Sequence, residues 1–206
     1  MKFLTKNRNS QILADKLVYK IGNSKNNNKL KAALLKEQKN FCAYTEIYIS
    51  QSDNGAYLES LDVDHFDASK KNTLVDDYYN YYTVSHKTNI QKLDERFKNA
   101  SFHKSLFFHI RENLDARIYY DVATNTYKTI KNNDTEAEEL IEFIRIDSEE
   151  VAHSREKHLD FLEEMKTDRG QTDEEFIEWL FKFPQQLNFI TAIEAKFNID
   201  LESRLP

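Results

Sequence analysis

Apolar residues recur at helical spacing over much of the chain. The first such run follows Ser10 and predicts an amphipathic helix over residues 10–21 with a serine N-cap. After a polar break at 22–28, a second helix is predicted over 29–38. Beyond Asp134, the spacing predicts helices over 135–144, 148–165, 173–181 and 186–197, with Pro184 separating the last two.

Between these helices the pattern changes to short β-like runs. They cover residues 41–44, 47–49 and 57–63, with turn residues at 52–55. Helical spacing returns over 88–97, and segments 116–122 and 127–130 predict a β-hairpin that turns at Thr124 and Asn125. The order predicts an α+β fold that is mostly helical. We expect basic N-terminal helices over 1–40, a core over 41–100, and the hairpin with an acidic helical region over 101–206, packed as one compact unit.

Composition favours a folded protein of the cytoplasm. Of the 206 residues, 40% are hydrophobic and 13% aromatic, which argues against a disordered chain. Cys42 is the single cysteine and has no internal disulfide partner, and no apolar run follows the basic start, so we expect a reducing cytoplasm. No stretch approaches the roughly 20 apolar residues that span a bilayer, so we expect no membrane role.

The net charge of −6 hides a gradient along the chain. Residues 1–40 hold 10 basic and 2 acidic side chains, whereas residues 134–206 hold 8 basic and 20 acidic ones. Such asymmetry is typical of a protein with one nucleic-acid-facing part, although solvated helix faces produce it too. We expect the acidic part to contact a protein partner or a second copy, because its charge repels phosphate.

One ordered set of polar residues carries the functional interpretation. Asp64 and His65 end a β-like run. Asn80 follows 15 residues after His65, Asn89 nine residues later, and Lys92 three residues after that. This order resembles the signature of HNH endonucleases, the ββα-metal family, in its His-Asn-Asn form, over residues 41–92. The resemblance implies a ββα-metal core and a hydrolase that cuts phosphodiester bonds.

The residue types suit that chemistry. By the resemblance, His65 is the general base, and Asp64 and Asn89 hold one Mg²⁺ or Mn²⁺ through hard oxygen ligands. Asn80 orients the imidazole of His65 or anchors the loop. Lys92, one helical turn after Asn89, is expected to face a phosphate. Further expected nucleic-acid contacts are Lys70, Lys71, Lys87 and Arg96.

The sequence departs from the family at its zinc knuckle. Many HNH proteins carry two Cys-x-x-Cys pairs around the site, and here the corresponding positions read Cys42-Ala43-Tyr44-Thr45 and Ser85-His86-Lys87-Thr88. Three of four thiolates are missing, so no structural zinc is expected. Hydroxyl groups and aromatic packing would then hold the two loops together. His86 reads as a surface histidine.

The chain is similar to the small HNH nucleases of bacterial anti-phage systems such as Septu, which act beside an ATPase. That similarity rests on size, Glu46 and the pattern from Ile141 to Arg155. It implies DNA, in preference to RNA, as substrate, an ATPase partner and a role in defence. Two alternatives stay open: an HNH-like ribonuclease or toxin, and a non-catalytic helical interaction module with a degenerate site.

Overall fold

The computed structural model describes residues 1–52, 56–92, 94–103 and 114–205. These residues form an α+β fold with two small antiparallel sheets. Strands β1 (Leu61–His65) and β2 (Tyr81–Ser85) make one sheet, and β3 (Ile118–Asp121) and β4 (Thr126–Thr129) make the other. The predicted hairpin is therefore confirmed. Within the described ranges, no helix combines the length and apolar character that crossing a bilayer requires.

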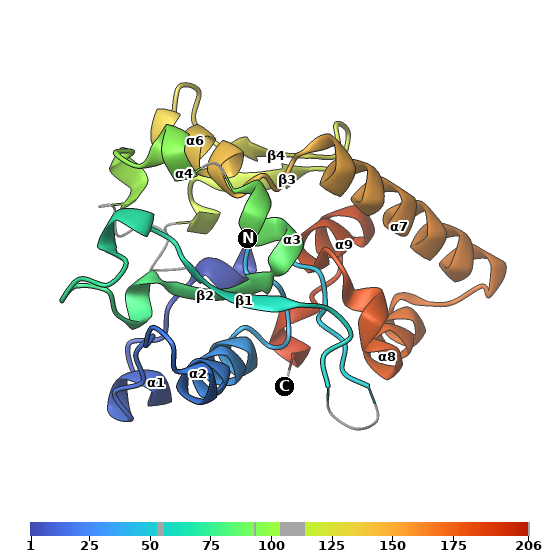
Figure 1. The fold of residues 1–206 in the computed structure, drawn as a ribbon. Coiled ribbons are helices and arrows are strands. Elements are labelled where there is room, and N and C mark those ends of the chain that lie inside the picture. The colour runs from blue at the N-terminus through green and yellow to red at the C-terminus, as the bar shows by residue number, and fades with distance from the viewer. Residues whose placement is uncertain (53–55, 93, 104–113, 206) are drawn as a thin grey trace.

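Helices surround both sheets (Figure 1). On the N-terminal side lie α1 (Gln11–Ala14) and α2 (Ser24–Glu37), and α3 (His86–Gln91) and α4 (Asp94–Phe97) follow β2. The C-terminal part holds α6 (Thr135–Ile144), α7 (Glu149–Asp168), α8 (Asp173–Lys182) and α9 (Ile190–Phe197). These four helices match the predicted ones to within a few residues, and the side chains of Asp134 and Thr172 cap α6 and α8.

The N-terminal helices differ from the prediction. The helix predicted over 10–21 ends at Ala14, because Lys16 takes a left-handed conformation with φ of 52°. The predicted polar break is helical from Ser24 onward, because the Asn23 side chain caps α2 by accepting a hydrogen bond from Asn26 N. Residues 17–21, which we call the strap, belong to neither helix.

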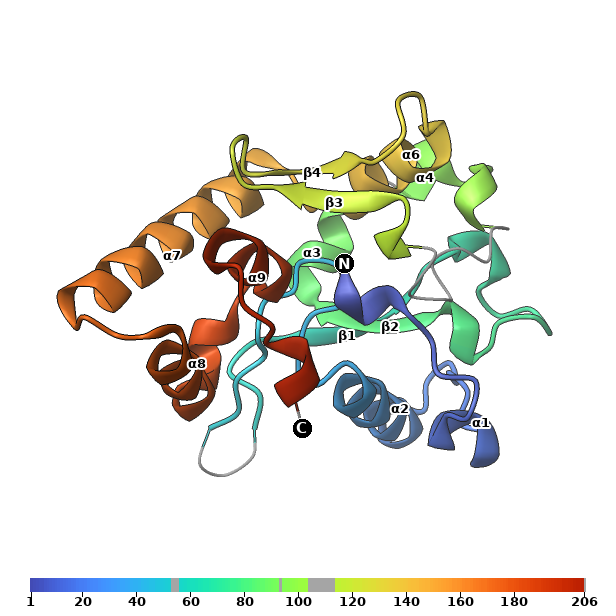
Figure 2. The same cartoon turned by 180° about the vertical axis from the view of Figure 1, so that it is seen from behind.

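The β1–β2 hairpin crosses the middle of the molecule, with α1 and α2 on one side and β3, β4 and α6 on the other (Figures 1 and 2). The register pairs Leu61 with Ser85 and His65 with Tyr81. Since α3 begins directly after β2 and packs on both strands, β1, β2 and α3 form a ββα unit. The helix predicted over 88–97 is split, because Lys92 is extended and separates α3 from α4.

The main hydrophobic core draws on residues from all parts of the chain, from Met1 and Phe41 through Phe143 to Leu201. At its centre, the ring of Phe66 contacts the rings of Phe102 and Phe143 with centroids 5.9 and 5.2 Å apart. A smaller cluster joins α1 and α2 to β2 through Ile12, Leu30, Leu34, Tyr78 and Tyr81. The ββα unit is thus packed on both faces of its hairpin.

Candidate functional site

Strand alternation divides the predicted site between the two faces of β1. Successive side chains of a strand point to opposite faces. Asp62 and Asp64 face α3, where they contact side chains of Asn89 and Lys92. His65 lies on the other face, where its ring contacts Tyr19 and Tyr81. The expected base and the expected metal ligand are therefore neighbours in sequence but belong to different surroundings.

Asp64 is already neutralised by a lysine. The Nζ of Lys92 lies 2.7 Å from each carboxylate oxygen of Asp64 and donates a third hydrogen bond, of 2.9 Å, to the carbonyl of His65. Tyr44 donates its hydroxyl to the same carboxylate. The side chain of Lys92 is 0% exposed, and its ammonium lies 5.2 Å from the ring centroid of Phe143. The structure corrects the expected placement of Lys92, which points into the protein instead of toward a phosphate.

Asn89 contacts a different carboxylate from the one expected. Its Nδ2 donates to Asp62 Oδ2 over 2.9 Å, and the Nδ1 of His86 lies 2.8 Å from the same oxygen. Asp64 and Asn89 are therefore not joined as a ligand pair in this fold. Among the residues that the structure describes, no group of three or more His, Cys, Asp and Glu side chains is placed to hold a metal ion.

His65 instead pairs with a carboxylate that the sequence did not indicate. Its Nε2 lies 3.2 Å from Oδ2 of Asp76, and the two side chains are 6% and 5% exposed. The contact is an electrostatic one, because Nε2 has no aligned hydrogen bond. Burial lowers the pKa of His65 below its ordinary value, and the charge of Lys71 adds to this, whereas Asp76 opposes it. The neutral imidazole, which can accept a proton, is thereby favoured near pH 7.

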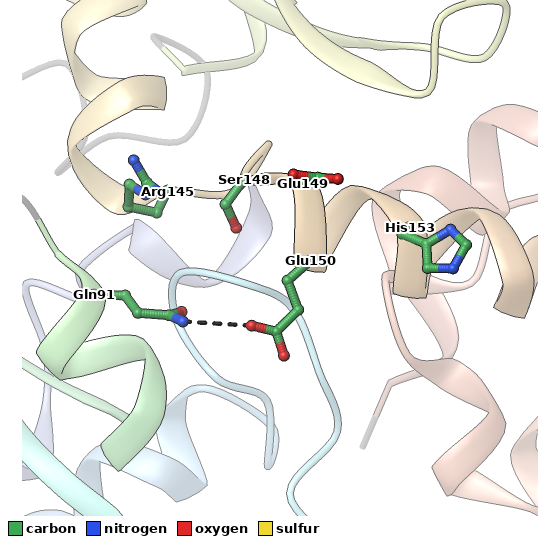
Figure 3. Close-up of a pocket in the computed structure, with 6 residues that line it drawn as sticks. All are labelled: Gln91, Arg145, Ser148, Glu149, Glu150 and His153. Carbon is green, nitrogen blue, oxygen red and sulfur yellow. Dashed lines mark hydrogen bonds between the residues drawn. The ribbon is translucent and has the colours of Figure 1, made fainter.

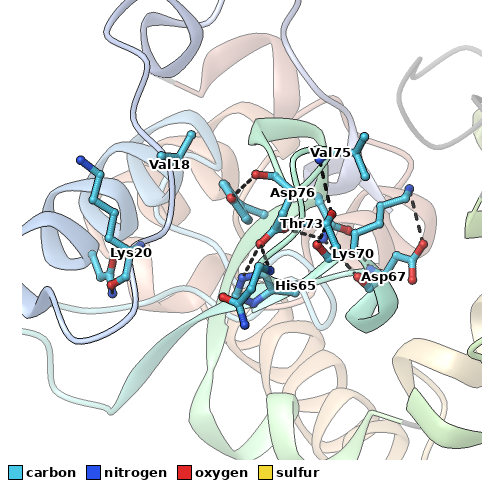
Figure 4. Close-up of polar contacts among 12 residues, drawn as sticks. Val18, Lys20, His65, Asp67, Lys70, Thr73, Val75 and Asp76 are labelled. Atoms are coloured by element: carbon cyan, nitrogen blue, oxygen red, sulfur yellow. Dashed lines mark hydrogen bonds and ion pairs between the residues drawn. The ribbon is translucent and has the colours of Figure 1, made fainter.

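His65 and Asp76 lie beside each other (Figure 4), and Asn80, at the end of the 3-10 turn before β2, holds the carboxylate of Asp76. Its Nδ2 donates to Oδ1 of Asp76 over 2.9 Å, and its Oδ1 accepts from the backbone N of Asp67 over 2.8 Å. The backbone N of Asn72 donates to Oδ2 of Asp76 over 3.0 Å. Asn80 therefore anchors the loop, one of its two expected roles, and acts on His65 through Asp76. No periodicity or motif marked Asp76, because its role depends on the path of the loop.

The strap covers His65. The ring of Tyr19 meets the imidazole edge-on at 4.8 Å, and the ring of Tyr81 meets it at 5.4 Å from β2. Side chains of α2 hold the strap: Asn27 exchanges two hydrogen bonds with the backbone of Lys20, and Asn26 donates to the carbonyl of Val18. These hydrogen bonds are exposed to solvent, so the strap is held more weakly than the hairpin beneath it.

Most of the expected phosphate-binding side chains are paired within the protein. Lys87 forms an ion pair with Glu150 of α7, and Arg96 forms one with Glu142 of α6. Lys70 lies 3.4 Å from Asp67. In the described parts of the chain, Lys71 alone of the five expected residues makes no ion pair with an acidic side chain. The acidic C-terminal helices thus neutralise two of the cations beside the ββα unit.

Segments 42–45 and 85–88, where the family resemblance would place a zinc knuckle, are held by packing and by contacts of hydroxyl groups. Cys42 is buried, and Thr45 beside it is buried as well. At the second pair position, the hydroxyls of Ser85 and Thr88 lie 2.8 Å apart. The ring of Tyr44 contacts that of Tyr82 at 5.9 Å between centroids, which joins the first loop to β2.

A cleft of about 570 Å³ opens between the end of α3 and the turn from α6 to α7 (Figure 3). Its lining residues are Gln91, Arg145, Ser148, Glu149, Glu150 and His153. Gln91 and Glu150 contact each other across it at 3.5 Å. His65 and Asp76 are not among its lining residues.

No protein-family model, curated protein or solved structure matches the chain.

Proposed function

We propose that this chain is an endonuclease of the ββα type that hydrolyses phosphodiester bonds, with His65 as the general base. The observation that carries the proposal is the position of His65 at the end of β1 in the ββα unit. Its buried imidazole Nε2 lies 3.2 Å from Oδ2 of the buried Asp76 side chain. A neutral imidazole beside a fixed carboxylate is an arrangement that takes a proton from water. The resemblance to HNH endonucleases supports the same role for His65.

Each polar residue around His65 has a part in this proposal. Asp76 stabilises the imidazolium that forms when a proton is taken up, because its carboxylate lies 3.2 Å from Nε2 and is held in place by Asn80 and by Asn72 N. Tyr19 excludes water from the ring in the closed form of the strap. Hydrolysis therefore requires the strap to move, so that water and a phosphate can reach the imidazole.

The expected divalent cation does not fit at Asp64 as the protein is folded. Both carboxylate oxygens accept hydrogen bonds from the ammonium of Lys92, and Asn89 is turned toward Asp62. A buried carboxylate whose charge is already balanced by an ammonium binds a second cation weakly. We still propose that the reaction depends on Mg²⁺ or Mn²⁺, but not on a cation held by Asp64 in this fold.

DNA is the proposed substrate, and the basic N-terminal part is the feature that favours a nucleic acid. Action beside an ATPase in anti-phage defence is proposed from the family resemblance. The test is cleavage of supercoiled plasmid and of structured RNA, with Mg²⁺ or Mn²⁺, by wild type, His65→Ala and the control His153→Ala. We expect nicked plasmid from wild type and control, and a rate lower by about 10²-fold or more for His65→Ala. Cleavage of the RNA alone would move the assignment to a ribonuclease.

One observation favours a second candidate, a non-catalytic interaction module. Lys92 satisfies Asp64, and Glu150 and Glu142 satisfy Lys87 and Arg96, so these groups are paired without any ligand. In that case wild type and His65→Ala are equally inactive on both nucleic acids, with each divalent cation and with an ATPase partner supplied.

A further inference from the structure

The side chains of Asp62 and His86 are more exposed to solvent than those of Asp64 and Lys92, and a cation can only bind a carboxylate that it can reach. Asp62 is 28% exposed and His86 is 57% exposed, whereas the Asp64 and Lys92 side chains are 6% and 0% exposed. The contacts of Asp62 described above come from neutral side chains or a titratable imidazole, and no ammonium is among them. A cation can therefore reach Asp62 from solvent, with water to complete its coordination.

His86 and Asn89 each lie close enough to Asp62 to share a cation with it. His86 and Asn89 stand three residues apart in α3, which places them on one face of the helix beside β1. Donors bound about 2.1 Å from a cation at right angles lie about 3.0 Å from each other. The Nδ1 of His86 and the amide of Asn89 lie 2.8 and 2.9 Å from Oδ2 of Asp62.

The donor types indicate which cation. Turning the amide of Asn89 by half a rotation brings its Oδ1 toward the same point and leaves its backbone in place. A carboxylate oxygen, an amide oxygen and an imidazole nitrogen then form a mixed set with room for waters. Such a set suits first-row divalent cations with six ligands, such as Mn²⁺, because imidazole and carboxylate both bind them.

We propose that Asp62, His86 and Asn89 form a binding site for one first-row divalent cation of the Mn²⁺ type, which ties β1 to the first turn of α3. The site lies on the face of β1 opposite His65. It does not depend on the proposed nuclease activity, and it assigns to Asn89 a carboxylate partner other than Asp64.

The test is titration of the full chain with Mn²⁺, followed by the electron paramagnetic resonance signal of free Mn²⁺. We expect one saturable site per chain in the wild type. Asp62→Asn and His86→Gln should each raise its Kd by about tenfold or more, since each removes a direct ligand. His153→Gln is the matched control, because His153 is also an exposed helical histidine beside a carboxylate, with Glu156 3.9 Å away. It should bind Mn²⁺ as the wild type does.

Asn89→Ala separates coordination from simple hydrogen bonding. If the side-chain oxygen of Asn89 faces the cation, its loss raises the Kd for Mn²⁺, and Mn²⁺ raises the Tm of the variant less than that of the wild type. If Asn89 serves only as a hydrogen-bond donor to Asp62, its loss frees the carboxylate and the Kd does not rise. The proposal is overturned by that result, by the absence of saturable binding to wild type, or by binding that survives both Asp62→Asn and His86→Gln. None of these measurements involves cleavage, so a failed nuclease assay does not affect them.

Discussion

The ammonium of Lys92 lies 2.7 Å from both carboxylate oxygens of Asp64, and both side chains are buried beneath α3. This contact joins the end of β1 to the residue that follows α3. It therefore holds the ββα unit together with a charge pair. The same contact explains why the carboxylate of Asp64 is not available to bind a cation from solvent.

Removing one partner of this pair should be costly. Lys92→Met keeps most of the side-chain volume but leaves Asp64 buried without its cation, so we expect a loss of about 3–5 kcal/mol in the free energy of unfolding. Chemical denaturation of purified protein measures it. The control Lys87→Met removes an exposed lysine and should change stability by less than about 0.5 kcal/mol. Similar small effects of both substitutions would show that Asp64 and Lys92 are not paired as described.

Glu46 predicts a dependence of stability on acid. Its carboxylate is fully buried, 3.3 Å from the ammonium of Met1, and accepts hydrogen bonds from the backbone N atoms of Lys2 and Thr191. Burial alone would raise the pKa of Glu46, but the ammonium and these hydrogen bonds outweigh it and lower the pKa to about 2. The ionised carboxylate therefore stabilises the fold above the ordinary pKa of 4.5, and this contribution is lost as the pH falls toward 2.

The variant Glu46→Gln isolates that contribution. Its deficit in unfolding free energy against wild type should be largest near pH 6 and should shrink as the pH falls from 4.5 to 2, measured by urea denaturation at each pH. Glu149→Gln, at an exposed position of α7, serves as the control and should change the unfolding free energy by less than about 0.5 kcal/mol. A deficit that stays constant over this range would contradict the assigned pKa.

The strap predicts a change in the accessibility of His65. Asn27→Ala removes both hydrogen bonds to Lys20, each exposed, so we expect the rate of carbethoxylation of His65 by diethyl pyrocarbonate to rise about fivefold, equivalent to about 1 kcal/mol. Peptide mass spectrometry measures this rate, with the exposed His86 as internal reference. Asn28→Ala, at the next position of α2, is the matched control. If wild-type His65 already reacts as fast as His86, the strap does not cover it.

Sequence patterns were informative for the fold where local and global preferences agree. Among the C-terminal helices, Asp134 caps α6 and Thr172 caps α8 together with Glu175. The apolar faces of these helices pack into the core, so periodicity was sufficient to place them. The strap shows the opposite case. Val18 and Ile21 fit a helical pattern but are 37% and 74% exposed, because Asn26 and Asn27 hold the backbone in another path. Such contacts between segments leave no periodic signal.

For the candidate site, the sequence indicated which residues gather but not how they pair. His65 and Asn89 lie on the ββα unit and Asn80 lies directly before β2. Their acidic partners are Asp76 and Asp62, which the motif did not single out. Strand alternation alone would have separated Asp64 from His65, since adjacent residues of a strand face opposite sides. The burial of Lys92 could not be predicted from its spacing, because it depends on Phe143 of α6, whose ring centroid lies 5.2 Å from the Lys92 ammonium.

We propose that His65 is the base of a phosphodiester hydrolysis. Single-turnover cleavage of end-labelled duplex DNA in Mn²⁺ by wild type and His65→Ala tests this role, with DNA affinity measured in parallel by fluorescence anisotropy. We expect the cleavage rate of His65→Ala to be lower by about 10²-fold or more, with Kd for DNA within about threefold of the wild-type value. Equal cleavage rates for the two proteins would contradict the assignment of His65.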